Sequence, residues 1–425
     1  KDDYPEHLRD AVQRIYTAPG FFRNLPPIDG ALDALQASAD DFVALRRDIH
    51  QHPELGYEEF RTSELVAERL ASWGYTVTRG LGGTGVVGQL RRGDGARRLG
   101  LRADMDALPI HEATGLPWAS THAGRMHACG HDGHTAMLLS AARHIAQHGR
   151  FSGTLNLIFQ PAEEGLGGAR QMMDDGLFER FPCDAIFGMH NMPGHRQGQL
   201  LLRDGATMAS SDGLTITLTG KGSHGAMPHH GIDPVVAGAS IVLGLQSIVA
   251  RNVDPQAMAV ITVGAFQAGQ AHNVIPNEAV LKLSVRSLDR DVRATLLRRI
   301  EELIDAQARS FNLTWTMECV TGYPVLVNTA AETDFARQVA VELVGADNVV
   351  PQAAPLSGSE DFAFMLEQVP GSYLLIGNGD NSGEPHNGGH GACMVHNPGY
   401  DFNDANLPIG AAYWALLTER FLTED

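Results

Sequence analysis

Histidine, cysteine and acidic side chains gather in a few short stretches of this 425-residue chain. In Cys129-Gly130-His131 a thiol and an imidazole lie two residues apart, and in Glu163-Glu164 two carboxylates are adjacent. Thiolate, imidazole and carboxylate groups are the protein ligands that Zn²⁺ prefers. Adjacent side chains in an extended segment point in opposite directions, so one carboxylate could hold a metal while the other handles a proton. These two stretches predict metal-assisted acid–base chemistry.

Two more histidines follow apolar residues in a similar way. His190 comes directly after residues 185–189, an apolar run that predicts a strand, and His396 follows Met394-Val395. Functional residues of a parallel sheet lie at the carboxyl ends of its strands, so residues from separate loops can meet there. This convergence, more than any single motif, predicts a metal centre.

The segments around these residues alternate between strand-like and helical patterns. Apolar runs predict strands, and apolar residues three and four positions apart predict helices. Strands are expected at residues 75–78, 85–90, 98–102, 154–159 and 185–189, and helices at 32–50, 58–73, 132–147, 165–174, 332–344, 361–367 and 404–421. This alternation predicts an α/β domain around a mostly parallel sheet.

Residues 211–325 follow a different order of elements. Strands are expected at 214–219, 259–266, 278–287 and 313–318, and helices at 234–249 and 291–310. This β-α-β-β-α-β order is typical of a ferredoxin-like α+β sandwich. We therefore expect a catalytic domain of residues 31–210 and 326–425, an inserted domain of residues 211–325, and an N-terminal extension of residues 1–30 with a helix at 6–16.

Charge, hydropathy and competing motifs exclude several classes of function. The net charge of −18 argues against nucleic acid or a membrane as a partner, and no uninterrupted apolar run approaches the roughly 20 residues of a membrane-spanning helix. Residues 80–85 match a dinucleotide-binding pattern but continue as a strand, which predicts a hairpin instead. No serine stands in the Gly-x-Ser-x-Gly motif of α/β-hydrolases. We expect a cytoplasmic protein, and the alternative is a removed signal peptide because the chain begins at Lys1.

Several motifs together resemble a known family. Residues 46–55, Arg-Arg-Asp-Ile-His-Gln-His-Pro-Glu-Leu, are similar to the opening of the aminoacylase and carboxypeptidase metallohydrolases. The chain most resembles the N-acyl-amino-acid amidohydrolase branch, which includes hippurate hydrolases and auxin-conjugate hydrolases. The resemblance covers about residues 40–421, with further matching runs in family order at residues 102–109, 126–135, 160–165, 188–191, 220–228, 272–276 and 358–362.

The resemblance implies a zinc-peptidase-like catalytic domain with two divalent ions per subunit, and an inserted dimerisation or lid domain. The ions would be Zn²⁺ or Mn²⁺, with Co²⁺ or Ni²⁺ as alternatives. Glu163 would be the general base, and the metal ligands would be Cys129, His131, Glu164, His190 and His396.

The resemblance also implies roles for three residues of the inserted domain. Asn273 and Arg286 would grip the carboxylate of the substrate, which suits the fork of a guanidinium group. His224 would reach into the active site of the partner subunit, in a homodimer or a higher homo-oligomer.

One departure from the wider family concerns the carboxylates. The family has His-x-Asp where this chain has Asp104-Met105-Asp106, and a bridging Asp where this chain has Cys129-Gly130-His131. We therefore expect Asp104 and Asp106 to support the ligands rather than to bind the ions. The identity of the metal stays open.

The expected reaction is cleavage of the amide bond of small N-acyl-L-amino acids to a carboxylic acid and a free amino acid. A metallocarboxypeptidase or dipeptidase would use the same residues, so it stays an alternative. A non-catalytic, histidine-rich metal-binding protein is the second alternative. The Glu163-Glu164 pair argues against it, because a storage site does not need a base beside its ligand.

Overall fold

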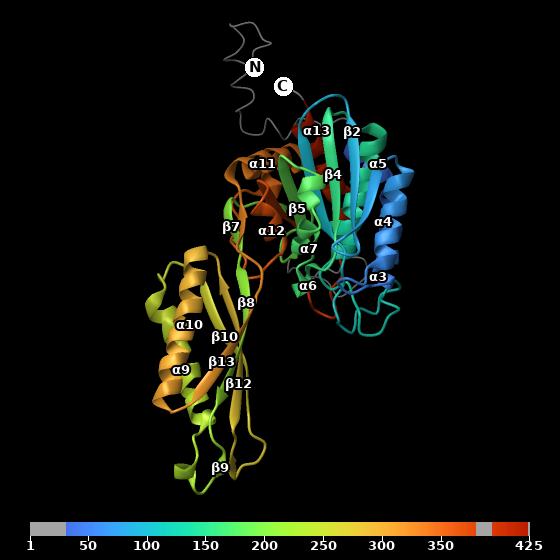
Figure 1. Cartoon of the computed structure of the whole chain (residues 1–425). Coiled ribbons are helices and arrows are strands. Elements are labelled where there is room, and N and C mark those ends of the chain that lie inside the picture. Colours follow the sequence, from blue (N-terminus) through green and yellow to red (C-terminus); the bar gives the residue numbers. More distant parts are fainter. Residues whose placement is uncertain (1–30, 380–392, 424–425) are drawn as a thin grey trace, which may run out of the picture. The chain divides into compact units, whose positions relative to one another are not determined.

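The computed structural model describes residues 31–379 and 393–423, and these form two compact units (Figure 1). Unit 1 holds the described residues of Lys1–Gly205, Asn328–Ala353 and Met365–Asp425. Unit 2 holds Ala206–Val327 and Ala354–Phe364. The predicted N-terminal extension, residues 1–30 with its helix, lies outside the described residues.

Unit 1 is built on an eight-stranded sheet. Its strands, in spatial order, are β1 (Thr76–Leu81), β2 (Gly85–Arg92), β4 (Gly153–Gln160), β3 (Arg98–Asp104), β5 (Ala185–Pro193), β16 (Gly371–Gly379), β6 (Leu200–Leu201) and β15 (Val349–Val350). The central strands β4, β3, β5 and β16 are parallel, whereas β1 and β2 form the predicted antiparallel hairpin. Every residue of β4 is buried, as expected for a strand covered on both faces. The α/β fold with a mostly parallel sheet is confirmed.

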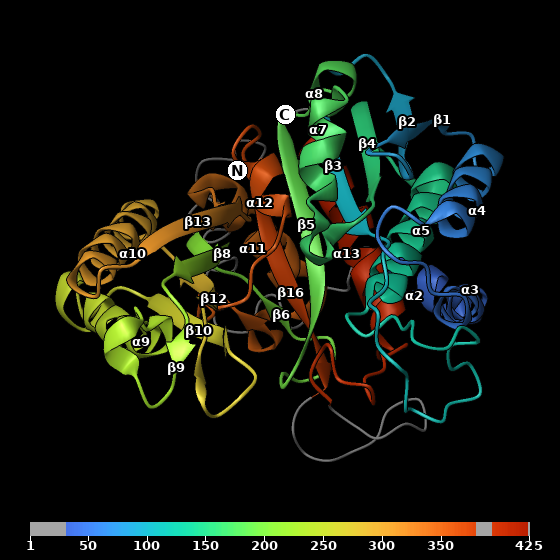
Figure 2. The ribbon, with the colours of Figure 1, turned by 60° about the horizontal axis from the view of Figure 1, so that its bottom comes forward.

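Helices of unit 1 pack against this sheet and against one another. Helices α5 (His131–His148) and α13 (Asn406–Leu422) lie side by side, and both contact β3 (Figure 2). The single helix predicted at 32–50 is interrupted at Ser38, whose hydroxyl donates to the Leu35 carbonyl. The remaining helices are α2 (Ala31–Ala37), α3 (Ala39–Gln51), α4 (Phe60–Ser72), α6 (Glu163–Leu166), α7 (Gly168–Asp174), α8 (Leu177–Arg180), α11 (Ala330–Val344) and α12 (Phe362–Leu366).

Strand β16 is a central strand that was not predicted from the sequence. Its residues 377–379, Gly-Asn-Gly, weaken the strand pattern, although the strand is almost wholly buried. Leu375 of β16 pairs with His190 of β5, and this pairing continues to Pro193. His190 therefore lies inside β5, and the expectation that it follows the end of the strand is wrong.

Unit 2 contains an antiparallel sheet of strands in the order β10 (Ala259–Ala268), β12 (Glu278–Ser287), β8 (Ser210–Thr219) and β13 (Thr314–Thr321). Helices α9 (Pro234–Asn252) and α10 (Arg290–Ser310) lie on one face of it (Figure 1). Each helix starts at an aspartate whose side chain accepts backbone N–H bonds, Asp233 for α9 and Asp289 for α10. The expected ferredoxin-like order is confirmed. The short elements β9 (Ser223–His224), β11 (Val274–Ile275) and η2 (Pro228–His230) also belong to unit 2. Strands β7 (Gly205–Met208) and β14 (Leu326–Asn328) each include the residue at which the chain passes between the units, and η3 (Ala346–Asn348) belongs to unit 1.

Helix α9 is, among the described residues, the one helix long and apolar enough to cross a membrane. Ile241, Leu245 and Ile248 of this helix are fully buried in the core of unit 2. Their spacing gives the helix an apolar stripe that packs on the sheet, as in a core helix of a globular domain.

Candidate metal and catalytic site

The candidate ligands of unit 1 lie near the carboxyl ends of its central strands. Asp104 ends β3, Glu163 is the third residue after β4, and His190 lies in the second half of β5. His131 is the first residue of α5. Because β3, β4 and β5 run parallel, these residues meet at one edge of the sheet.

The structure brings the five ligand candidates and Glu163 into overlapping groups. Within each group, the ligand atoms all lie within 4.8 Å of one another. Three of the groups are Cys129, His131 and His190; Cys129, Glu164 and His396; and His131, Glu163 and Glu164, and a further group joins His131 to Asp104 and His134. Cys129 belongs to two groups, so one thiolate is placed where it could serve two ions.

A glycine between Cys129 and His131 makes this turn possible. Gly130 has a φ of 95°, in the region where other residues are strained. A Cβ atom there would lie 2.2 Å from Asn191 Nδ2 and 2.5 Å from Tyr400 Oη. Only glycine leaves room for these two side chains against the backbone of the turn.

Asp106 connects two candidate ligands. Its Oδ1 atom lies 3.2 Å from His131 Nδ1, and its Oδ2 atom accepts a hydrogen bond of 2.9 Å from the Glu164 backbone N–H. Such carboxylate–histidine contacts fix the orientation of a metal-ligating imidazole and leave its other nitrogen for the ion.

Asp104 is surrounded by cationic and imidazole groups. Its Oδ2 atom accepts from Arg102 Nη1 at 2.7 Å, and its Oδ1 atom lies 2.6 Å from His134 Nδ1. Burial raises the pKa of Asp104, but His131, Arg102 and His134 outweigh burial and hold it well below its usual range. The carboxylate is therefore ionised and already occupied by donors.

His134 and Asn191 also belong to this site, although their roles were not predicted from the sequence. His134 Nε2 accepts from the backbone N–H of Asn191 at 3.0 Å, so both nitrogens of this imidazole are engaged. Asn191 Nδ2 also donates to the Cys129 carbonyl at 2.7 Å, and Tyr400 Oη donates to Asn191 Oδ1 at 2.5 Å. Their positions in the sequence could have indicated these roles, because His134 is three residues after His131 and Asn191 directly follows His190.

The donor set fits a divalent metal. His131 Nε2 and Glu164 Oε1 are buried atoms without a well-directed hydrogen bond among the described residues, although His396 Nε2 lies 3.2 Å from Glu164 Oε1. Buried polar atoms are normally satisfied, so these two point to a missing partner. Burial raises the pKa of the Cys129 thiol well above its usual value, and Glu164 and Glu163 raise it further. A bound cation would offset this accumulation of negative charge.

His190 is suited to bind a metal as a neutral imidazole. Burial, and then the neighbouring His134, lower its pKa well below the usual value. Its Nδ1 atom lies 2.5 Å from the carbonyl oxygen of Asn191, and its Nε2 atom lies 3.3 Å from Cys129 Sγ. The Nε2 atom therefore faces the thiol of the candidate site.

Glu163 and Glu164 do not point in opposite directions, so that expectation is wrong. Each places a carboxylate oxygen within 4.8 Å of a His131 ring nitrogen. The segment is bent rather than extended: Ala162 has a φ of 54°, and Glu164 has non-helical dihedral angles. Glu163 is 7% exposed, so a carboxylate with little access to bulk water stands beside the candidate ligands.

His396 approaches the same ligands from the C-terminal part of the chain. Its backbone N–H donates to the Ala128 carbonyl at 2.6 Å, which places it next to the Cys129 turn. Its side chain is 52% exposed, in contrast to the buried His131. This ligand candidate is therefore the one that faces solvent.

Three predicted site residues lie in unit 2. His224 ends β9, Asn273 precedes β11, and Arg286 lies in β12. Arg286 Nη1 donates to the Ser357 carbonyl at 3.0 Å, and His224 Nδ1 accepts from the Ala226 backbone N–H at 3.0 Å. Their roles toward a substrate stay predictions.

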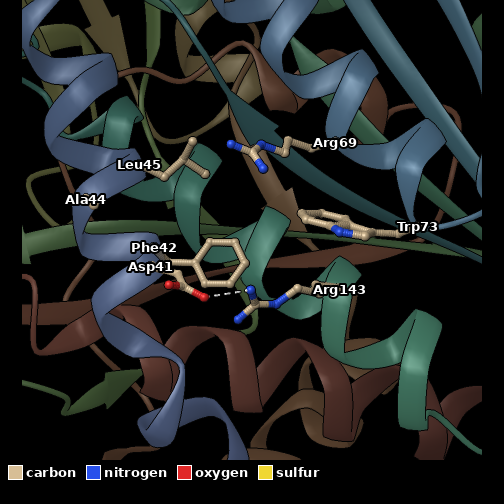
Figure 3. Close-up of a pocket in the computed structure, with 7 residues that line it drawn as sticks. All are labelled: Asp41, Phe42, Ala44, Leu45, Arg69, Trp73 and Arg143. Carbon is tan, nitrogen blue, oxygen red and sulfur yellow. Dashed lines mark hydrogen bonds and ion pairs between the residues drawn. The ribbon is translucent and has the colours of Figure 1, made fainter.

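A cavity of about 350 Å³ between α3, α4 and α5 does not contain these residues (Figure 3). It is lined by Asp41, Phe42, Ala44, Leu45, Arg69, Trp73 and Arg143. Its carboxylate, Asp41, is paired with Arg143 at 2.9 Å, as the dashed line in Figure 3 marks. With no histidine or cysteine in its lining, this cavity cannot hold the metal centre.

We predict that stability falls at high pH because of His50. Burial lowers the pKa of His50, but Asp132, 2.8 Å from Nδ1, and Glu112, 3.3 Å from Nε2, outweigh burial and raise it to about 9. The protonated His50 therefore stabilises the folded state. This contribution is fully present below the pKa of about 6.5 in the unfolded chain and is lost as the pH rises through the folded-state pKa of about 9. Urea unfolding of the metal-free protein should give a free energy lower by on the order of 2 kcal/mol at pH 9.5 than at pH 6.

His50→Asn should reduce this difference, because asparagine does not titrate. It should not abolish the difference, because burial lowers the pKa of His131 but Asp104 and Asp106 outweigh burial and raise it to about 10. His122→Asn, at an exposed histidine, is the matched control and should keep it. An equal loss of stability in wild type and His50→Asn would assign the effect to other groups.

Comparison with known proteins places these features in a family. A model of peptidase family M20/M25/M40 matches residues 100–420. A hippurate hydrolase of Campylobacter jejuni is 44% identical over 382 residues, which cover 90% of this chain and 97% of that protein. The IAA-amino acid hydrolase ILR1-like 4 of Arabidopsis thaliana is 37% identical over 390 residues, covering 91% of this chain and 86% of that protein.

A solved structure agrees with these matches. The Bacillus subtilis YXEP protein, described as a dinuclear metal-binding peptidase of the M20 family, superimposes with a TM-score of 0.77 at 31% identity. The superposition covers 91% of this chain and 99% of that structure. The resemblance found in the sequence is confirmed, and the chain belongs to peptidase family M20/M25/M40.

Proposed function

We propose that this protein is a metal-dependent amidohydrolase that cleaves N-acyl-L-amino acids to a carboxylic acid and a free amino acid. The observation that carries the proposal is the position of Glu163, a nearly buried carboxylate within 4.8 Å of ligand atoms of both His131 and Glu164. A base beside a candidate metal centre serves hydrolysis rather than storage. The hippurate hydrolase and the IAA-amino acid hydrolase among the relatives support the same substrate class.

The metal centre would hold two divalent ions per subunit. The residues that would hold them are Cys129, His131, Glu164, His190 and His396. The thiolate and imidazole ligands favour Zn²⁺, whereas the carboxylate also suits Mn²⁺, and Co²⁺ or Ni²⁺ are alternatives. Bound ions would polarise the amide carbonyl and lower the pKa of a water molecule.

Glu163 accepts the proton of the attacking water and then delivers it to the leaving nitrogen. Because the Glu163 side chain is nearly buried, bulk water has little access to the proton that it accepts before the proton reaches the leaving nitrogen. Asp106 holds the His131 ring and the Glu164 backbone in place while negative charge develops on the carbonyl oxygen of the substrate. Asp104 and Asp106 thus support the ligands.

Unit 2 would supply the groups that recognise the substrate. Arg286 and Asn273 would bind the α-carboxylate, and His224 of a partner subunit would donate to the oxyanion. We propose a homodimer, because β10 is an edge strand of the unit 2 sheet and its Phe266 is 39% exposed. A solution mass of twice 45.7 kDa by sedimentation would support it, and a 45.7 kDa monomer with full activity would contradict it.

Arg286→Ala is predicted to raise KM for substrates with a free α-carboxylate by about 10- to 100-fold and to change kcat less. The guanidinium would bind the carboxylate in the ground state and in the transition state alike. The measurement compares hippurate with its carboxyl-blocked amide. Arg298→Ala, an exposed arginine on α10, is the matched control. Equal losses on both substrates would contradict this role.

A panel of substrates tests the proposed function. The metal-free protein is reconstituted with Zn²⁺, Mn²⁺, Co²⁺ or Ni²⁺ and assayed with hippurate, N-acetyl amino acids, an auxin–amino acid conjugate and dipeptides. Faster cleavage of the N-acyl amino acids supports the proposal. Preferred cleavage of dipeptides would favour a peptidase, and no hydrolysis with any of the metals would favour a non-catalytic metal-binding protein.

A further inference from the structure

Arg46 of α3 is a fully buried arginine that the proposed mechanism does not use. It is the first residue of the motif at residues 46–55, and its side chain is 0% exposed. Arginine is almost never fully buried unless it is paired. Its neighbours therefore indicate what it is there to hold.

The guanidinium of Arg46 contacts carboxylates from two distant parts of the chain. Its Nη2 atom donates a hydrogen bond to Asp401 Oδ1, and its Nε atom forms an ion pair with Asp132 Oδ2 at 2.9 Å without hydrogen-bond geometry. Its Nη1 atom lies 3.5 Å from Asp404 Oδ1. Asp132 and the Asp401–Asp404 segment are thus joined through one side chain, which we name the Arg46 clamp.

Each end of the Arg46 clamp adjoins a candidate metal ligand. Asp132 directly follows His131, and Asp401 lies five residues after His396. Between His396 and Asp401, Tyr400 binds Asn191, which in turn binds the Cys129 carbonyl. The clamp therefore joins the segment that carries His131 to the segment that carries His396.

Stability alone is a weak reason for this arrangement. Removing a guanidinium from water has a large free-energy cost, and buried ion pairs are often no more stabilising than apolar residues of similar volume. A buried ionic group can instead select one arrangement of the segments it joins. Here the selected arrangement would be the spacing of His131 and His396.

We propose that Arg46 is a positioning residue for the metal centre, whose guanidinium fixes the N-terminal turn of α5 against the segment that follows His396. The inference rests on the proposed metal-dependent function. Arg47 offers a matched control from the same helix. It pairs with Asp404 at 2.7 Å, stacks on Trp118 and is 33% exposed, whereas Asp132 is paired with Arg46.

The test measures metal binding and folding separately. Dissociation constants for Zn²⁺ and Mn²⁺ are determined on the metal-free full chain by competition with a chromophoric chelator, and thermal unfolding of the same samples is recorded. The variants are Arg46→Lys, which keeps the charge but loses the fork, Asp401→Asn, and Arg47→Met. Arg46→Lys and Asp401→Asn should each weaken at least one metal site by about 10- to 100-fold, and Arg47→Met by less than about threefold.

The outcomes separate the clamp from the proposed function. If wild type binds two ions and both Arg46→Lys and Asp401→Asn bind them as tightly, the clamp is overturned while the metal centre stands. A lower unfolding temperature with unchanged dissociation constants would likewise overturn it, because the role would then be structural only. If wild type binds no metal, the proposed function fails, and the clamp fails with it.

Discussion

Glu163→Gln is expected to lower kcat by about 100- to 10,000-fold while both metal ions stay bound. The amide has the shape of the carboxylate but cannot accept a proton, and Glu163 is nearly buried beside Glu164 and His131. Turnover of an N-acyl amino acid and metal content by mass spectrometry are measured on the same sample.

Glu179→Gln serves as the control for this experiment. Glu179 is an exposed glutamate on α8, apart from the candidate ligands, and its substitution should leave kcat unchanged. Full activity in Glu163→Gln would remove Glu163 from the role of base. Loss of the metals together with activity would make it a ligand instead.

Cys129→Ser is expected to reduce bound metal below two ions per chain and to lower kcat/KM by at least about 100-fold. The Cys129 sulfur belongs to two of the ligand groups, so its loss affects both candidate ion positions. A serine hydroxyl has nearly the same size but is a poorer ligand for Zn²⁺ than a thiolate. Metal content after dialysis and kcat/KM at saturating metal are the measurements.

Cys183→Ser is the matched control, since Cys183 is a free thiol elsewhere in unit 1 that donates to the Phe181 carbonyl. It should keep two ions and full activity. If Cys129→Ser also kept two ions with wild-type affinity, the thiolate would not be a ligand.

Local patterns in the sequence predicted a large part of the fold. The mostly apolar sequence of β4 predicted a strand that is buried on both faces. In β8 the alternation of Leu214, Ile216 and Leu218 with polar residues predicted a strand with one buried face. Strand β16 escaped because glycine and asparagine near its end hide a strand whose position depends on its neighbours. Such a strand is defined by its pairing with β5, which no local window contains.

The residues of the candidate site could likewise be predicted where they stand in short motifs, and not where they depend on contacts between distant parts of the chain. Cys129, His131 and Glu164 stand in short motifs whose chemistry can be read directly, and the structure brings them together with His190 and His396. The contacts that orient them join distant residues. Arg46 and Asp401, for example, are 355 positions apart. Pairs of this kind leave no periodic pattern, so the sequence gives no sign of the clamp.

The relation between function and the metal centre is tested most directly by titrating metal into the metal-free protein while hippurate hydrolysis is followed. We predict no hydrolysis without metal, and a rate that rises with added Zn²⁺ or Mn²⁺ and levels off at two ions per chain. Hydrolysis that persists at the full rate in the metal-free protein, or a rate that saturates with no metal bound at Cys129 and His131, would contradict the account.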